Sequence, residues 1–426
     1  MLKQLHMSRF KSFESATMKF GDFTALLGVN ASGKSNARDA LRFLHGVSRG
    51  YSLAEVIGEK WIEGGVLQWR GVRGGSRQIV REGARSFRLT LEFTYLDGNR
   101  SKDARYSIEV DIDPGDRIPK VTLERLILKG PDQYVFDSHP DGYGLGSDQL
   151  HISARVRRKS QGAPRSIQFL NTQPILSQLP NNPAVLEWAG RNATAAMTVL
   201  GSMRFLDLSP DAARQPSLAG LTTLGDRGEN LSSVLQAITS NEGMKEELAA
   251  WVGELTPLDA RDFEFESDSS GRVLAILVEA NGRRTPLTTA SDGTVRFLAT
   301  ISALLGPEPA RFSFFEEIEN GIHPSRLHLL LELMERSVAS AGTQVAATTH
   351  SPYLLPQMSV MQRQQALLCF RNSEGDSSIV PIMELPGAQK VLTEHDPARL
   401  MASGWFEDTV DFAELGLENS SKSAVS

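Results

Sequence analysis

Two stretches of the chain alternate between hydrophobic and polar residues. The hydrophobic positions are Phe87, Leu89, Leu91, Phe93 and Tyr95 in the first stretch and Tyr106, Ile108, Val110 and Ile112 in the second. Successive side chains of a β-strand point to opposite faces, so each stretch predicts a strand with two different faces. Asp97-Gly98 lies between the stretches and favours a turn, so the pattern predicts a β-hairpin.

Short stretches without charged residues occur elsewhere, at 23–27, 312–315 and 343–349, and predict buried strands. Hydrophobic residues three or four positions apart, the spacing of one helix face, occupy 37–44, 295–305 and 327–338. Strands and helices that follow one another in this way predict an α/β fold.

A glycine-rich segment, Gly28–Ser35, joins the first buried strand to the first helical stretch. Its sequence, GVNASGKS, matches the phosphate-binding pattern G-x-x-x-x-G-K-[ST] at every fixed position. In such a loop, backbone N–H groups surround the phosphates, the lysine reaches the β- and γ-phosphates, and the hydroxyl binds Mg²⁺. We therefore expect a nucleoside triphosphate site formed by Asn30, Gly33, Lys34, Ser35 and Asn36, with Ser35 also a metal ligand.

Two adjacent acids, Glu316 and Glu317, end the buried run 312–315. Neighbouring strand side chains face opposite ways, so the two carboxylates have different tasks. We expect Glu316 to orient the waters on Mg²⁺ and Glu317 to act as the general base on the attacking water. His350 follows the next buried strand, at the edge where parallel sheets bind ligands, and is the third catalytic candidate.

A short turn, Ser291-Asp292-Gly293-Thr294, precedes the helical stretch 295–305. Serine and glycine at a helix N-terminus form a second potential anion site. Because Ser-Asp-Gly is also a common turn sequence, this signal is informative only in order with the other three elements.

In chain order, the phosphate-binding loop, the serine–glycine turn, the pair of acids and His350 resemble the ABC-type ATPase heads of the SMC, RecF and OLD group. The resemblance covers about residues 1–45 and 285–355. Within that group the chain is most similar to the compact stand-alone AAA family ATP-binding proteins of bacterial anti-phage operons. The segments that carry this finer likeness are Phe10–Phe13, Gly33–Asn36, Glu317–Pro324 and Thr348–Pro352. Two residues depart from the pattern: Glu316 replaces the usual aspartate, and Asp292 replaces a glycine found in many transporters.

The resemblance implies a split ABC-ATPase head of the P-loop NTPase class, with a β-rich first lobe, a helical lid insertion and no long coiled coil. It implies ATP and Mg²⁺ as cofactors. It also implies a homodimer or higher homo-oligomer, in which Ser291 and Gly293 of one subunit complete the ATP site of the other. The group carries a glutamine near the metal, for which we take Gln173, with Gln68 and Gln78 as alternatives.

A long insertion separates Gly33 from Ser291 and sets the expected domain boundaries. We expect a first ATPase lobe over 1–180, a helical lid over 181–260 and a second lobe over 261–418. The lid includes a helix that begins near Asn230. The serine-rich residues 419–426 are expected to form a flexible tail.

Composition adds a few exclusions. The 426 residues are 40% hydrophobic and 23% charged, typical of a globular protein of two or three domain-sized units. We find no run of eighteen apolar residues and no apolar N-terminal segment, so we expect no membrane span and a cytoplasmic location. A single cysteine, Cys369, excludes an internal disulfide and a cysteine-built zinc site.

The net charge of −6 argues against a wholly basic surface, but two basic stretches lie in the insertion. Their members are Arg70, Arg73, Arg77, Arg81 and Arg85 in the first, and Arg155, Arg157, Arg158, Lys159 and Arg165 in the second. Each stretch is either a solvated loop or a contact surface for nucleic-acid phosphates. Neither aromatic interleaving nor zinc-finger spacing indicates sequence-specific reading.

From these motifs and the resemblance, we expect an ATP switch that senses or engages nucleic acid or a phage product. It would control a separate effector, a nuclease or toxin, in anti-phage defence. A RecF-like role in DNA repair or chromosome maintenance shares every motif and is the alternative. A built-in nuclease is disfavoured, because the segment after His350 is short and carries no clustered carboxylate motif.

Overall fold

The computed structural model describes residues 1–98, 100–112, 115, 118–128, 134–138, 150–157, 163–255, 260–372, 374–406 and 408–409. The chain divides into two compact units, each assembled from distant parts of the sequence. The first contains Met1–Gly21, Val29–Met203 and Cys369–Val380, and the second contains Asp22–Gly28, Arg204–Leu368 and Pro381–Ser426.

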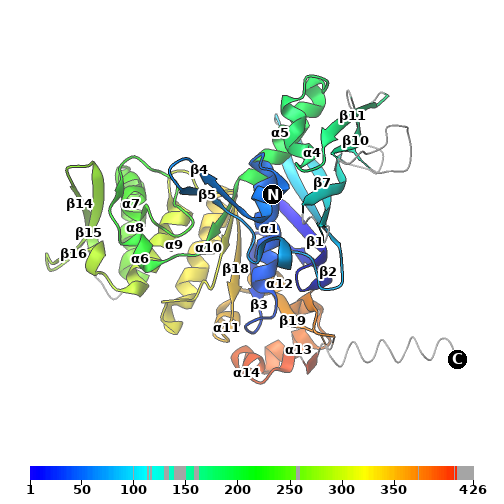
Figure 1. Cartoon of the computed structure of the whole chain (residues 1–426). Helices are drawn as coiled ribbons and strands as arrows, with labels where there is room; N and C mark the ends of the chain where they lie inside the picture. Colours follow the sequence, from blue (N-terminus) through cyan, green and yellow to red (C-terminus); the bar gives the residue numbers. More distant parts are fainter. Residues whose placement is uncertain are drawn as a thin grey trace. The chain divides into compact units, whose positions relative to one another are not determined.

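An antiparallel sheet of eight strands forms the first unit (Figure 1). In order across the sheet, the strands are β11 (Arg165–Leu170), β10 (His151–Val156), β9 (Tyr134–Asp137), β8 (Pro119–Leu128), β7 (Arg100–Ile112), β6 (Ser86–Asp97), β1 (Leu2–Phe10) and β2 (Phe13–Lys19). The predicted hairpin is confirmed as β6 and β7, which pair from Ser86 opposite Asp111 to Asp97 opposite Arg100.

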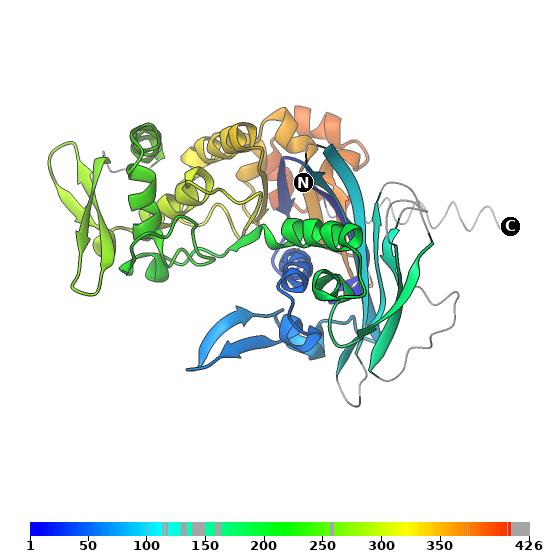
Figure 2. The same cartoon turned by 90° about the horizontal axis from the view of Figure 1, so that it is seen from above.

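Helices α1 (Lys34–Ser48), α4 (Ile175–Gln178) and α5 (Glu187–Gly201) lie on one face of this sheet (Figure 2). The alternating hydrophobic side chains of β6 from Phe87 to Tyr95 face them and are fully buried or nearly so. The Tyr95 hydroxyl of β6 donates to Asn192 Oδ1 of α5 at 2.5 Å. The remaining elements of this unit are α2 (Leu53–Ile57), α3 (Gly75–Gln78), the 3-10 helix η1 (Leu179–Asn181) and a two-stranded sheet of β4 (Glu59–Ile62) and β5 (Val66–Arg70).

Parallel strands form the centre of the second unit. They belong to a six-stranded sheet with the order β12 (Met203–Leu206), β17 (Phe312–Phe315), β18 (Gln344–Thr349), β3 (Phe23–Leu27), β19 (Leu367–Arg371) and β20 (Ser377–Pro381). Of these strands, residues 369–371 of β19 and 377–380 of β20 are assigned to the first unit. Strands β17, β18, β3 and β19 run parallel. Every side chain of β3, β17 and β18 is buried, which explains why these stretches contain no charged residue.

Helix α10 (Leu327–Ala341) packs on β3 and β18, and α9 (Asp292–Leu305) packs on α10. A second, antiparallel sheet contains β13 (Ser217–Leu218), β15 (Arg272–Glu279), β14 (Ala260–Ser267) and β16 (Arg284–Pro286). The other elements are α6 (Pro210–Ala213), α7 (Leu231–Thr239), α8 (Glu242–Leu255), α11 (Leu354–Gln357), α12 (Val360–Gln364), α13 (Ala388–Glu394), α14 (Pro397–Ala402), η2 (Leu287–Thr289), η3 (Pro324–Arg326) and η4 (Ile382–Glu384).

The expected helical lid over 181–260 is divided between the two units. Helix α5 belongs to the first unit through its contacts with α1 and β6, whereas α7 and α8 pack on β15 and β14 of the second. Helix α7 begins after Asn230 as predicted, although the Asn230 side chain accepts the Gly225 N–H at 2.8 Å instead of capping the helix. The predicted boundaries at 180 and 260 therefore differ from the observed units.

The predicted α/β fold with a β-rich first lobe is confirmed. The longest helices of the described residues, α1, α5 and α10, each have 15 residues, so this part of the chain contains no long coiled coil. Within the same residues, no helix has the length and apolar character needed to cross a membrane. The predicted tail, 419–426, lies outside the described residues.

Candidate functional site

The phosphate-binding segment lies between β3 and α1, as its sequence predicts. Lys34 opens α1, and its Nζ donates to the Val29 carbonyl at 2.8 Å. Gly33 has a φ of 119°, and a Cβ there would lie 2.4 Å from Ser377 Oγ, so this position requires glycine. Asn30, at the crest of the loop, is exposed.

A hydroxyl pair fixes the start of α1. Ser12 Oγ accepts a hydrogen bond from Asn36 Nδ2 at 2.7 Å and lies 2.7 Å from Ser377 Oγ. The Asn36 amide, which we expected at the nucleotide, is thus bonded to Ser12 in this structure. Ser35 lies half-buried beside it in the first turn of α1.

In the second unit, the two acids after β17 have different surroundings. Glu316 is half-buried, and its N–H donates to the Leu206 carbonyl at 3.0 Å. Glu317 is exposed, has a φ of 46°, and donates its N–H to Thr348 Oγ1 at 3.0 Å. Asn320 Nδ2 donates to Glu317 Oε2. The left-handed backbone at Glu317 separates the directions of the two carboxylates, and two neighbours fix Glu317.

His350 lies beside a third acid that the sequence patterns did not indicate. Glu319 Oε1 accepts the N–H groups of His350 at 3.0 Å and Ser351 at 3.1 Å, and lies 3.4 Å from His350 Nδ1. Glu319 is buried, whereas the His350 side chain is 41% exposed. Glu319 therefore anchors the turn that carries the histidine. Its place two residues after the acid pair was the one available signal.

The serine–glycine turn begins α9. Ser291 is exposed, and its Oγ accepts the Thr294 N–H at 3.2 Å, which makes it the N-cap. A Cβ on Gly293 would lie 2.5 Å from the Gly321 carbonyl oxygen. Gly293 is therefore required by the close approach of two backbone segments within the second unit.

Two predicted residues of the second unit, Glu316 and His350, lie at one edge of its parallel sheet. Strands β17, β18 and β3 are adjacent, in register and parallel, and neighbouring strands lie about 4.8 Å apart. Each is followed directly by a predicted residue: Glu316, His350 and Gly28, the first glycine of the phosphate-binding pattern. The carboxyl edge of a parallel sheet is where α/β folds bind ligands.

Gln173, the predicted glutamine ligand of the metal, lies at the other end of α1 from Ser35. Gln173 Nε2 donates to the Gly50 carbonyl at 2.9 Å, beyond the carboxyl end of α1, whereas Ser35 lies in the first turn of that helix. At a rise of 1.5 Å per residue these two ends are about 20 Å apart. Gln173 therefore does not reach a metal ion held by Ser35.

A buried acid explains where Gln173 lies. Glu124 of β8 accepts the N–H groups of Ile175 at 2.6 Å and Leu176 at 2.8 Å, and the Tyr106 hydroxyl at 2.8 Å. Burial raises the pKa of Glu124 to about 7. These bonds fasten the start of α4, and Gln173 just before it, to the eight-stranded sheet.

Of the two alternatives, Gln78 lies nearer the phosphate-binding loop. It ends α3, and the carbonyl of the next residue, Ile79, accepts the Lys11 N–H at 2.9 Å. Lys11 precedes Ser12, which is bonded to the first turn of α1. Gln68 is exposed on β5.

The first basic stretch contributes to the structure of the first unit. Arg73 pairs with the fully buried Asp39 of α1 at 3.1 Å, and Arg81 pairs with Asp376 at 2.8 Å. Lys11 also pairs with Asp39, with its Nζ 2.5 Å from Asp39 Oδ2. Burial lowers the pKa of Lys11, although Asp39 partly offsets this effect.

The second basic stretch lies at the edge of the eight-stranded sheet. Arg155 is on β10 and Arg165 on β11. Arg157 follows β10, and its guanidinium lies 4.6 Å from the centre of the Tyr134 ring, a cation–π contact. Residues 158–159 of this stretch lie outside the described residues.

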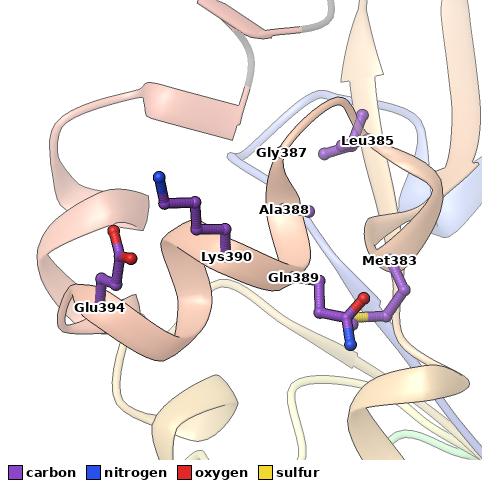
Figure 3. Close-up of a pocket in the computed structure, with 7 residues that line it drawn as sticks. All are labelled: Met383, Leu385, Gly387, Ala388, Gln389, Lys390 and Glu394. Carbon is purple, nitrogen blue, oxygen red and sulfur yellow. The ribbon is translucent and has the colours of Figure 1, made fainter.

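The cavity in Figure 3 contains none of the predicted site residues. It has a volume of about 570 Å³ and is lined by residues of η4 and α13 and the segment between them: Met383, Leu385, Gly387, Ala388, Gln389, Lys390 and Glu394. In the described part of the chain, no group of three or more His, Cys, Asp or Glu side chains could hold a metal ion. A Mg²⁺ ion would therefore need water or phosphate to complete its shell.

Residues 23–355 match the family described as "AAA domain, putative AbiEii toxin, Type IV TA system". A relative in Helicobacter pylori, "ATP/GTP phosphatase", is 21% identical over 393 residues, covering 89% of this chain and 95% of that protein. "Chromosome partition protein Smc" of Methanococcus voltae is 43% identical over 53 residues, 12% of this chain and 4% of that protein. A solved SMC head bound to the C-winged helix domain of ScpA has a TM-score of 0.48 at 15% identity, covering 89% of this chain and 97% of that chain.

Proposed function

This chain belongs to that AAA domain family, and on this premise we propose that it binds ATP with Mg²⁺, hydrolyses it, and dimerises around it. The observation that carries the proposal is the sheet edge at which Gly28, Glu316 and His350 meet. The relative named ATP/GTP phosphatase supports nucleotide hydrolysis.

We assign the phosphates to the loop from Val29 to Ser35, with Lys34 supplying the positive charge. Hydroxyl and carboxylate oxygens are the ligands that Mg²⁺ prefers, and Ser35 and Glu316 offer them. Gln78 takes the role first given to Gln173. When bound, the ion would neutralise charge on the β- and γ-phosphates.

Glu317 is the proposed general base. Its carboxylate is held by Asn320 and its backbone by Thr348, so little reorganisation is needed before it accepts a proton from water. His350, oriented by Glu319, is the proposed donor to the γ-phosphate.

The proposed dimer uses the first turn of α9. Ser291 is exposed at the positive end of a helix of 14 residues, which suits contact with an anion. We propose that Ser291 and Gly293 of one subunit complete the nucleotide site of the other.

Ser291→Arg is expected to leave ATP binding to one subunit nearly unchanged and to abolish ATP-driven association and hydrolysis, because the larger cation blocks the contact. Mixing it with Lys34→Ala protein should restore one composite site per heterodimer, since each variant supplies the half that the other lacks. Phosphate release by the mixture, compared with each variant alone, is the experiment that tests the proposed function.

Ser340→Arg, the same substitution at an exposed position of α10, is the matched control and should hydrolyse ATP normally. Sedimentation of Glu317→Gln protein with ATP measures association directly. A trapped protein that stays monomeric at tens of micromolar, together with an inactive mixture, would contradict the shared site.

We further propose that the switch serves anti-phage defence through a separate effector, a nuclease or toxin. The family description, which names a toxin and a toxin–antitoxin system, supports this role. A RecF-like function in DNA repair or chromosome maintenance is the alternative. A neighbouring nuclease or toxin gene would favour defence, and neighbouring replication genes would favour repair.

Nucleic acid is the second partner we propose, and one row of residues favours it. One polar position from each strand lies in register across all eight strands: Thr17, His6, Thr90, Ser107, Arg125, Asp137, Arg155 and Ser166. Near the middle of the sheet the charges are paired, as in Arg88 with Glu109. At the β8–β10 end, Arg125, Arg155 and Arg157 lie around one aspartate, Asp137, so positive side chains outnumber negative ones among the described residues there, which suits contact with phosphates.

Replacing Arg125, Arg155 and Arg157 together by glutamine is expected to weaken DNA binding and reduce its salt dependence. Each lost phosphate contact lowers the slope of log K against log salt by about 0.9 for duplex and 0.7 for single strands, so three lost contacts should lower it by roughly two to three. Filter binding at several salt concentrations measures it, with Arg100→Gln as the control on an exposed end of β7. Unchanged binding by the triple variant would remove this face from the proposal.

A further inference from the structure

Three carbonyl groups of the phosphate-binding loop accept hydrogen bonds from side chains. The donor–acceptor pairs are Lys34 Nζ to Val29 at 2.8 Å, Arg371 Nε to Ala31 at 2.9 Å, and Cys369 Sγ to Ser32 at 3.3 Å. All of these residues belong to the first unit. These three bonds fix the conformation of the loop and with it the directions of its N–H groups, the groups that such loops offer to phosphate.

Two of the donors come from one strand. Cys369 and Arg371 are two positions apart on β19, the spacing that places side chains on one face of a strand. Cys369 is buried, and burial raises the pKa of its thiol to about 11, so the thiol remains protonated and able to donate. The other end of the Arg371 guanidinium donates to the Gly375 carbonyl at 3.1 Å, which fixes its plane.

Ala31 is the position in the loop that most needs support. Its φ is 64°, in the left-handed region that favours glycine, and Ala31 carries a Cβ. Such a conformation costs about 1 kcal/mol or more and persists only where the surroundings enforce it. The bond from Arg371 is made to the carbonyl of this same residue.

We propose that Arg371 is a positioning residue for the phosphate-binding loop, with Cys369 in a lesser supporting role. Arg371 holds the Ala31 carbonyl, stabilises the left-handed backbone, and thereby keeps the loop N–H groups oriented toward the triphosphate before ATP arrives. This inference rests on the proposed function, because it assigns the loop to ATP. Arg371 itself does not contact the reacting atoms.

A double-mutant cycle with Ala31 tests the inference. Arg371→Ala is expected to raise the Kd and KM for ATP about tenfold while changing kcat less than about threefold, because nucleotide binding and not the chemical step depends on the loop's orientation. Ala31→Gly removes the backbone strain. In the Ala31→Gly background, the same Arg371→Ala change should raise the Kd less than about threefold.

If Arg371→Ala raises the Kd for ATP equally in the unmodified chain and in the Ala31→Gly background, the inference is overturned, because Arg371 would then act on the nucleotide independently of Ala31. A fall in kcat with unchanged KM would overturn it too. Calorimetry on the unmodified chain separates these results from failure of the proposed function, since a chain that does not bind ATP fails before any variant is made. Thermal unfolding checks each variant, and Arg371→Met, which keeps the aliphatic stem, replaces Arg371→Ala in the cycle if the alanine protein does not fold.

Discussion

Replacing Glu317 by glutamine is expected to leave ATP bound and to slow hydrolysis by about 10²-fold or more, the scale of losing a general base. Glutamine has nearly the same shape, so Asn320 and Thr348 can hold the side chain and backbone as before. It cannot accept the proton of the attacking water. Single-turnover phosphate release, measured beside ATP affinity, separates the lost chemistry from lost binding.

The matched variant is Glu316→Gln, one residue away. We expect it to lower the affinity of the site for Mg²⁺ and to make hydrolysis less dependent on Mg²⁺, since Glu316 is assigned to the metal. If Glu316→Gln stops hydrolysis while Glu317→Gln turns over normally, the two roles have been exchanged. The left-handed backbone at Glu317 is the structural reason to expect that they have not.

Lys34→Ala is expected to lower ATP affinity at least tenfold, about 1.4 kcal/mol or more. Lys34 is the lysine of the phosphate-binding pattern, and its Nζ lies 2.8 Å from the Val29 carbonyl of the same loop. Removing it takes away both the charge that we assign to the β- and γ-phosphates and one bond that shapes the loop. Calorimetry with ATP measures the loss.

Lys19→Ala, which removes an exposed lysine of β2, is the control for the change in net charge. Its affinity for ATP should match that of the unmodified chain. An unchanged affinity in Lys34→Ala would contradict the assignment of the phosphate-binding loop itself, and with it every role given to the residues around the loop.

Local patterns predicted the elements that carry the site. Strands β3, β17 and β18 are buried on both faces, so their sequences carry no charge, and each ends directly before a residue that the sequence analysis singled out. The hairpin of β6 and β7 was equally clear, because one face packs on helices and the other does not. Short-range spacing was enough in these cases because the elements are contiguous in the chain.

Long-range pairing could not be predicted in the same way. Gln173 follows a strand, as the resembling family requires, but Glu124, far earlier in the chain, fixes that segment near the carboxyl end of α1. The lid was expected to be one element because its helices are consecutive, yet the Tyr95–Asn192 bond joins α5 to the first unit. Glu319 was overlooked because its role depends on the turn after β18, a separate part of the sequence.

The contact between Gly293 and Gly321 has a consequence for when ATP is hydrolysed. Gly321 follows Asn320, whose amide holds the Glu317 carboxylate, so the first turn of α9 and the proposed base are joined through one short backbone contact. On the proposed mechanism, a second subunit that docks on Ser291 presses on the same turn that positions the base. A lone subunit would then keep its nucleotide intact, and hydrolysis would follow second-order kinetics in protein, beginning when two copies meet.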